Sequence, residues 1–231
     1  MRTNDILVIA FDADDTLWDC QSHFENVERD YCRLLAEYGD SDDISSRLFR
    51  TEATNMELLG YGTKAFTLSL VENAVNISQG KVSAKTIGKI IELGKSLLYL
   101  PATPLPGVRE TLRAIRSLNR YRLALFTKGE LLDQENKLQR SGLAPFFSHV
   151  EIVCDKTPAH YRALCHHLNI SPERLLMVGN SFRSDIAPAL NIGAHAAYIP
   201  FHVTWQLELT DEFDHPHLTR LKQYGDIMSI L

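Results

Sequence analysis

The sequence predicts an α/β protein: a doubly wound, Rossmann-like parallel sheet core that carries an inserted α-helical bundle. Two observations lead to this prediction. From Val108 to Ile199, short and wholly apolar strands alternate with amphipathic helices, which is typical of a parallel sheet with helices on both faces. Between the first apolar strand and this region, residues 20–100 show apolar side chains at helical spacing and no strand-like alternation.

The inserted region is expected to form four helices joined by short loops, as in a helical bundle. Their apolar faces cover residues 24–38, 42–59, 66–74 and 87–98. The segment 101–107, PATPLPG, contains three prolines and ends in glycine, so it marks a boundary. We therefore expect residues 1–18 and 101–231 to form the core and residues 19–100 to form a separate helical domain.

The core elements follow in order from the apolar runs. The first strand is Ile6–Phe11, and the later elements are predicted as helix 108–118, strand 121–126, helix 131–142, strand 150–153, helix 158–168, strand 175–178, helix 186–190 and strand 194–199. Residues 201–209 are expected to cover the sheet edge, and residues 218–231 to form a terminal helix. Right-handed crossovers between parallel strands favour a doubly wound fold. In such a fold ligands bind beyond the carboxyl ends of the strands, so we expect the functional residues there.

Composition excludes several classes of function. The chain has 231 residues and a net charge of -5, and it contains no Lys/Arg run that would bind nucleic acid. No apolar run approaches the roughly 20 residues of a membrane span, and residues 1–5 leave no room for a secretory leader. The four cysteines include no CxxC pair. We expect a cytoplasmic protein with reduced thiols; the sequence carries no signal for an oligomeric state.

Polar residues follow each of the first four strands of the core. Asp12, Asp14 and Asp15 come directly after the first strand, where clustered like charges are costly without a cation. The later strands lead into Thr127-Lys128-Gly129, into Asp155-Lys156, and into Gly179-Asn180-Ser181 with Asp185 close behind. Parallel strands bring these clusters to one rim, where carboxylates, a hydroxyl and a lysine suit a divalent cation with a phosphate on it.

These residues resemble the motifs of the haloacid dehalogenase-like hydrolase superfamily. The sequence FDADDT matches its first motif, Thr127 its second, Lys156 its third and GNSFRSD its fourth, and the helical insertion matches its cap domain. The resemblance implies that Asp12 is the nucleophile and Asp14 the general acid/base. It also implies that Thr127 and Lys156 hold the phosphoryl group and that Asp185 helps to bind Mg²⁺.

The chemistry of these residues agrees with a magnesium-dependent phosphatase that hydrolyses a small phosphorylated metabolite through an aspartyl-phosphate. The Asp12 carboxylate, the Asp14 main-chain carbonyl and Asp185 would supply oxygen ligands to Mg²⁺. Asn180 departs from the usual aspartate of the fourth motif and leaves one negative charge fewer, so we expect weaker Mg²⁺ binding. Backbone N–H groups around Thr127, Lys128 and Gly129 are expected to bind phosphate oxygens, with Lys64 of the helical domain as a further substrate contact.

Two other functions use the same residues. A phosphotransferase or sugar-phosphate mutase would pass the phosphoryl group to a second hydroxyl, and a regulatory module would bind a phosphorylated ligand with residual activity. Asp14 favours phosphoryl chemistry over halide displacement, because only an alkoxide leaving group needs a carboxyl group to protonate it. Asp15 is expected to brace the turn that leads into the helical domain.

Overall fold

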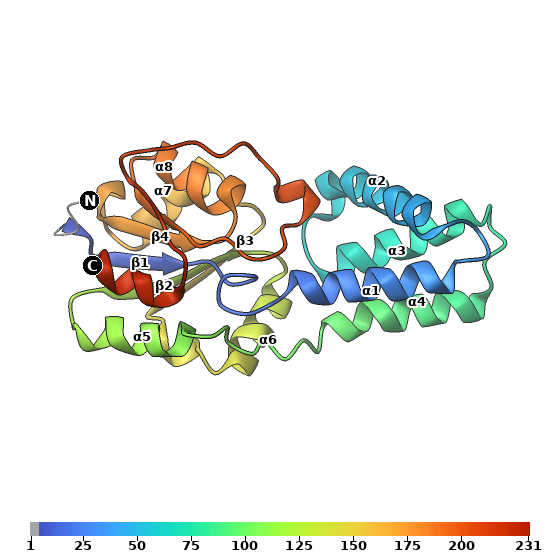
Figure 1. The fold of residues 1–231 in the computed structure, drawn as a ribbon, viewed down its shortest axis with the longest axis horizontal. Coiled ribbons are helices and arrows are strands. Elements are labelled where there is room, and N and C mark those ends of the chain that lie inside the picture. Colours follow the sequence, from blue (N-terminus) through green and yellow to red (C-terminus); the bar gives the residue numbers. More distant parts are fainter. Residues whose placement is uncertain (1–4) are drawn as a thin grey trace. The chain divides into compact units, whose positions relative to one another are not determined.

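A computed structural model describes residues 5–231 (Figure 1). Residues 1–4, where we expect no secretory leader, lie outside the described residues. The chain separates into two compact units: one contains the chain up to Gln21 and from Ala102 onward, and the other is Ser22–Pro101. None of the helices in the described part of the chain is long and apolar enough to cross a bilayer.

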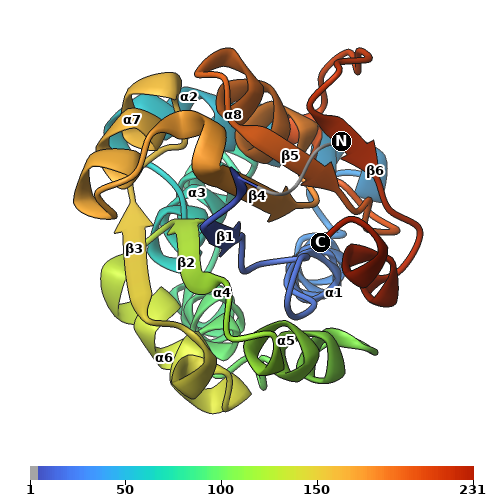
Figure 2. The ribbon, with the colours of Figure 1, turned by 90° about the vertical axis from the view of Figure 1, so that its left-hand side faces the viewer.

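The first unit is built on a six-stranded sheet in which every pair of neighbouring strands is parallel. The strands are β1 (Val8–Phe11), β2 (Arg122–Lys128), β3 (His149–Val153), β4 (Leu175–Gly179), β5 (His195–Tyr198) and β6 (Leu218–Arg220). Their order across the sheet is β3-β2-β1-β4-β5-β6, as Figure 2 shows. The predicted α/β fold is confirmed, and β1 lies between β2 and β4, so Asp12 follows a central strand.

Helices cover both faces of this sheet because the side chains of each strand alternate between the faces. In β1, Ile9 and Phe11 pack in the same cluster as residues of α5 (Val108–Ser117) and α6 (Leu131–Ser141). Val8 and Ala10 pack in a second cluster with α7 (Pro158–His167) and α8 (Ala187–Asn191). Figure 2 shows α5 and α6 on one side of the sheet and α7 and α8 on the other.

The predicted terminal helix over residues 218–231 is wrong. Leu218–Arg220 instead forms β6, which pairs in parallel with β5 through Ala196↔Leu218, and a short 3-10 helix follows at Tyr224–Ser229. The pairing of β6 with β5 and the burial of Tyr224 and Ile227 in the core cluster that contains residues of α5 favour this arrangement over a helix. The helix predicted at 186–190 is likewise only part of a longer element, because a π-helical turn, Phe182–Ile186, leads into α8.

The second unit contains four helices in the places where the sequence predicts them. They are α1 (Gln21–Leu34), α2 (Ser41–Leu59), α3 (Thr63–Ile77) and α4 (Ala84–Leu97), and they run lengthwise alongside one another (Figure 1). Two helices begin at capping residues: Asp40 accepts a hydrogen bond from the Asp43 N–H in α2, and Ser83 does so from Thr86 in α4. The helix α1 ends at Leu34, earlier than the predicted end at Tyr38.

Asp15 braces the turn between β1 and α1, as the sequence predicts. Its Oδ1 accepts hydrogen bonds from the Cys20 N–H at 2.8 Å and the Gln21 N–H at 2.9 Å, and its backbone is left-handed, with φ of 60°. Asp and Asn tolerate this conformation better than other residues with side chains. Burial raises the pKa of Asp15 to about 7, although the two N–H donors act to lower it.

Replacing Asp15 with alanine is therefore expected to destabilise the protein by about 1–3 kcal/mol, because two buried N–H groups lose their acceptor and the strained backbone loses a tolerant residue. Asp15→Asn keeps both an acceptor oxygen and the tolerance for positive φ, so its loss should be smaller. Urea unfolding of the two variants measures the difference. Equal losses of stability would show that the side chain does not brace the turn.

Candidate active site

The centre of the site is a lysine that joins two carboxylates. Lys156, which follows β3, donates hydrogen bonds from Nζ to Asp12 Oδ1 and, at 2.7 Å, to Asp185 Oδ1. All three side chains are buried: Lys156 is 3% exposed, Asp12 7% and Asp185 1%. Two carboxylates this close in a buried place repel each other, and the ammonium group between them offsets that repulsion. The parallel sheet thus brings together residues that lie far apart in the chain.

Asp185 is fixed by its own turn. The Ser181 N–H donates to Asp185 Oδ2 at 2.9 Å, and a Cβ placed on Gly179 would lie only 2.2 Å from the same oxygen. Glycine at position 179 is therefore needed for the close approach of this carboxylate to the end of β4. Burial raises the pKa of Asp185 to about 7, with a further increase from the Asp12 charge, while Lys156 acts to lower it.

Thr16 connects Asp12 to Asn180. Its Oγ1 lies 3.0 Å from Asp12 Oδ2 and 2.9 Å from Asn180 Oδ1, and it accepts a hydrogen bond from the Asn180 N–H at 3.0 Å. A hydroxyl group carries one proton, so it can donate fully to only one of the two oxygens at a time. The other oxygen keeps its lone pairs for another partner, either a hydrogen-bond donor or a cation.

Asp14 points toward a different lysine. Its carboxylate accepts hydrogen bonds from Lys137 Nζ at 2.7 and 2.9 Å, from Gln134 Nε2 at 2.8 Å and from Trp18 Nε1 at 2.7 Å. Burial alone would raise the pKa of Asp14, but the Lys137 charge and these donors outweigh burial and lower it. Asp14 is therefore paired with α6, and these contacts favour its ionised form.

Sequence reasoning missed Lys137 and Gln134. They lie on consecutive turns of α6, and both are buried, at 3% exposed each. The signal was the pair of polar residues on the inward face of an otherwise amphipathic helix directly after the second motif. Such residues usually need buried partners, which Asp14 supplies here.

The second motif has a different arrangement from the one expected. Thr127 is 1% exposed near the end of β2, opposite Ile152 of β3. The Gly129 N–H, expected to bind phosphate, instead donates to the Val153 carbonyl at 3.0 Å, because the pairing between the strands continues past the end of β2. The Lys128 side chain pairs with Glu208. Lys64 is exposed near the start of α3 in the helical unit, and its contact with substrate stays a prediction.

The donors at the Asp12 rim fit a small, hard cation. Within residues 5–231, no three His, Cys, Asp or Glu side chains are placed to hold a metal ion together. A cation here would therefore need two carboxylates, Asp12 and Asp185, together with neutral oxygens from Asn180 and the Asp14 main chain. A set made only of oxygens suits Mg²⁺ and not a metal that prefers sulfur or nitrogen.

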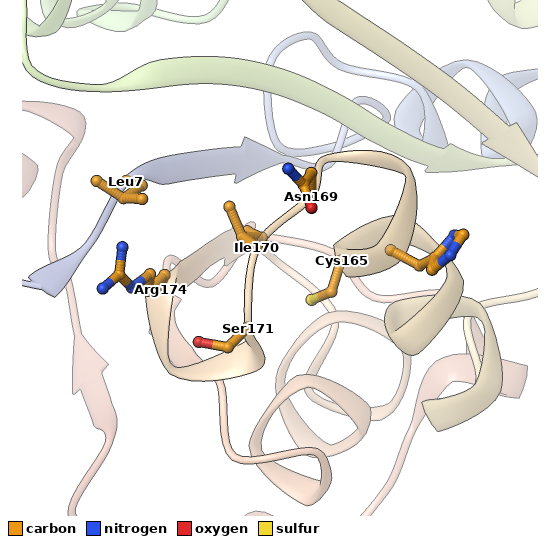
Figure 3. Close-up of a pocket in the computed structure, with 7 residues that line it drawn as sticks. Leu7, Cys165, Asn169, Ile170, Ser171 and Arg174 are labelled. Atoms are coloured by element: carbon orange, nitrogen blue, oxygen red, sulfur yellow. The ribbon is translucent and has the colours of Figure 1, made fainter.

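A hollow of about 410 Å³ lies elsewhere in the same unit (Figure 3). Leu7, which precedes β1, lines it together with Cys165, Asn169, Ile170 and Arg174. It is therefore at the amino end of β1, whereas Asp12 follows the carboxyl end. Because it contains none of the motif residues, the hollow is separate from the candidate site.

Comparison with known proteins identifies the family of this chain. A family model described as haloacid dehalogenase-like hydrolase matches residues 6–193. The chain belongs to this family. A haloacid dehalogenase-like family hydrolase from Xanthomonas campestris, known from its crystal structure, is 33% identical, with a TM-score of 0.88 over 98% of this chain and 90% of that one.

Among the curated relatives of this chain, one is named a phosphatase and another a nucleotidase. A glyceraldehyde 3-phosphate phosphatase from Pyrococcus abyssi is 29% identical, over 85% of this chain and 82% of the relative. A pyrimidine 5'-nucleotidase from Escherichia coli is 26% identical, over 84% of this chain and 86% of the relative. Together with the family match, these relatives support a hydrolase that acts on phosphate monoesters.

Proposed function

We propose that this protein is a magnesium-dependent phosphatase that hydrolyses a small phosphate monoester through an aspartyl-phosphate. The observation that carries the proposal is the buried arrangement of Asp12, Lys156 and Asp185 at the carboxyl end of a central strand. A carboxylate in this place is both a nucleophile and a cation ligand, and the ammonium beside it offsets the charge of an incoming phosphate. The names of the curated relatives support the same reaction class.

In the first step, a carboxylate oxygen of Asp12 attacks phosphorus and forms a P–O bond as the ester P–O bond breaks. The leaving alkoxide takes a proton from the Asp14 carboxyl group. Lys156 and Thr127 hold the phosphoryl oxygens while negative charge moves onto the leaving group. For this step Asp14 must carry a proton, and protonation removes the charge that attracts Lys137.

In the second step, water attacks the phosphorus of the aspartyl-phosphate and the bond to Asp12 breaks, which restores the Asp12 carboxylate. Asp14 accepts the proton that the water loses. The ionised state of Asp14, held by Lys137 and Gln134, is the state that this step requires. The pairing with Lys137 therefore favours the form of Asp14 that acts as a base.

Asp12, Asp185, Asn180 and the Asp14 carbonyl would hold Mg²⁺. When bound, the ion supplies positive charge that offsets the repulsion between the carboxylates and the phosphate. For the substrate we propose a small phosphorylated metabolite, as the names of the relatives suggest. The helical unit, with Lys64, is proposed to contribute to substrate choice as a cap domain.

The proposal is tested with a panel of phosphate esters, including glyceraldehyde 3-phosphate and pyrimidine nucleoside monophosphates, incubated with Mg²⁺. We expect free phosphate to appear in proportion to the ester consumed. The control is the same reaction with the metal chelated, in which release should stop. A sugar phosphate that is isomerised without release of phosphate would contradict hydrolysis and would favour phosphoryl transfer.

Replacing Asn180 with aspartate is expected to strengthen Mg²⁺ binding by about ten-fold, because a further negative charge would lie near the cation. The same charge should make the metal-free protein less stable, since Asp12 and Asp185 are already close. Calorimetric titration with Mg²⁺ and thermal unfolding with and without the ion measure both effects. Unchanged Mg²⁺ affinity would mean that residue 180 is not near the ion.

A further inference from the structure

Glu208 lies in the segment that follows β5, within a short 3-10 helix, Gln206–Glu208. From the sequence, residues 201–209 are expected only to cover the edge of the sheet. In the structure the Glu208 side chain is 10% exposed, and the neighbouring Leu207 carbonyl accepts a hydrogen bond from the Arg183 guanidinium. A glutamate that is this well buried needs partners, and its partners come from two motifs of the active site.

The two carboxylate oxygens of Glu208 bind different parts of the chain. Oε1 accepts from Lys128 Nζ, which belongs to the end of β2. Oε2 accepts from the hydroxyl groups of Ser181 and, at 2.6 Å, Ser184, both in the turn after β4. Lys128 Nζ also donates to Ser184 Oγ at 2.9 Å, which closes the network. Burial alone would raise the pKa of Glu208, but Lys128 and the two serines outweigh it and lower the pKa.

The two serines bound by Glu208 are the residues that shape the turn around Asp185. Ser181 Oγ accepts a hydrogen bond from the Ser184 N–H at 3.0 Å, and the Ser181 carbonyl accepts from the Asp185 N–H at 2.8 Å. The Ser181 N–H in turn donates to the Asp185 carboxylate. Any shift of Ser181 therefore moves Asp185, which has little room because Gly179 is directly behind it.

The same network accounts for Lys128. Lys128 follows Thr127 of the second motif, and from the sequence its backbone N–H is expected to bind phosphate. In the structure its charge is offset by Glu208 and its direction is set by Ser184. A partly buried lysine that is paired in this way links two loops. Binding phosphate would require it to leave a charge-assisted hydrogen bond.

We propose that Glu208 is a positioning residue, which joins the turn after β2 to the turn after β4 and thereby holds Asp185 in place for Mg²⁺ and Lys156. The proposal rests on the proposed function for the role of Asp185. Outer residues that orient a metal ligand typically affect metal affinity or activity by about 10- to 100-fold. Glu208 acts through Ser181 and Ser184, and it does not touch the reacting atoms.

The test is the variant Glu208→Gln, which keeps the size of the side chain and removes its charge. We expect the Mg²⁺ dissociation constant, measured by calorimetric titration, to rise by about 10- to 100-fold. The turnover number with a phosphate ester should fall, with a smaller change in KM. The reason is that displacement of Asp185 affects the metal ligand and the transition state. The matched control is Glu212→Gln, in which an exposed glutamate of the same segment loses its ion pair with Arg220.

Two results would overturn the proposal: Mg²⁺ affinity in Glu208→Gln equal to that of Glu212→Gln, or a loss of affinity that matches a general loss of folded protein in thermal unfolding. A second variant, Lys128→Met, separates loss of the Lys128–Glu208 pair from a general loss of folded protein. If loss of this pair is the cause, combining Lys128→Met with Glu208→Gln should lower Mg²⁺ affinity little more than either change alone. Failure of the proposed function would instead appear as absence of phosphate release by the unmodified protein, whereas the calorimetric comparison needs no turnover.

Discussion

Replacing Asp12 with asparagine is expected to lower the rate of phosphate release by about 10⁴-fold or more, as happens when other hydrolases lose their nucleophile. The amide is a poor nucleophile and forms no aspartyl-phosphate. The change is nearly isosteric: the amide oxygen can face Lys156, and the amide NH2 can then donate to the Thr16 hydroxyl, which also accepts hydrogen bonds. Phosphate release from an ester at saturating Mg²⁺ measures the effect.

The same variant should be at least as stable as the original protein. Apart from burial, the charge of Asp12 is the largest influence that raises the pKa of Asp185, which shows that the two carboxylates repel each other. Lys156 retains Asp185 as a partner at 2.7 Å after the change. Loss of activity together with a marked loss of stability would contradict this account. Asp214→Asn, at a fully exposed carboxylate, is the control for removal of one acidic charge.

Replacing Lys156 with methionine is expected to reduce both stability and activity. The side chain is 1% exposed, and its removal leaves Asp12 and Asp185 buried without the cation between them. Breaking a buried pair in this way typically costs about 3–5 kcal/mol of folding free energy. Activity should fall by about 10²- to 10³-fold, because one donor to the phosphoryl oxygens is lost. Urea unfolding and ester hydrolysis measure the two losses.

Magnesium provides a sharper test of Lys156. If two carboxylates repel each other in Lys156→Met, Mg²⁺ should raise its unfolding temperature more than it raises that of the original protein, because only the variant lacks a resident cation. The control is Lys95→Met, in which an exposed lysine loses its ion pair with Glu92. An equal shift in all three proteins would show that Lys156 does not neutralise this pair of carboxylates.

Much of the core follows from sequence patterns alone. The strands β1 and β4 are continuous apolar runs and β2 contains one at 123–126, and parallel pairing places the residues after these runs on one rim. That rule is sufficient to bring Asp12 and Asp185 near each other before any coordinates are known. The strand β6 escaped prediction because three residues are too short for a periodic signal, and only its pairing with β5 stabilises it.

The partners of the site residues were harder to predict. Lys137 reaches Asp14 from a helix 123 positions away in the chain, and Glu208 reaches Lys128 across 80 positions. Neither distance follows from a motif, because it depends on where a helix and a loop pack on the finished sheet. For the same reason the role of the Lys128 side chain could not be predicted: the sequence places it beside Thr127 but does not show the carboxylate that pairs with it.

Three lysines, Lys128, Lys137 and Lys156, pair with carboxylates, and all of these except Asp133 come from other parts of the chain. The carboxylates are Asp12, Asp14, Asp133, Asp185 and Glu208. Five carboxylates share three ammonium groups, so this set contains more acidic than basic groups. The site would therefore attract the proposed Mg²⁺ even before substrate arrives. Its affinity for the ion should fall at high ionic strength less than that of an exposed carboxylate pair, since buried charges are screened little.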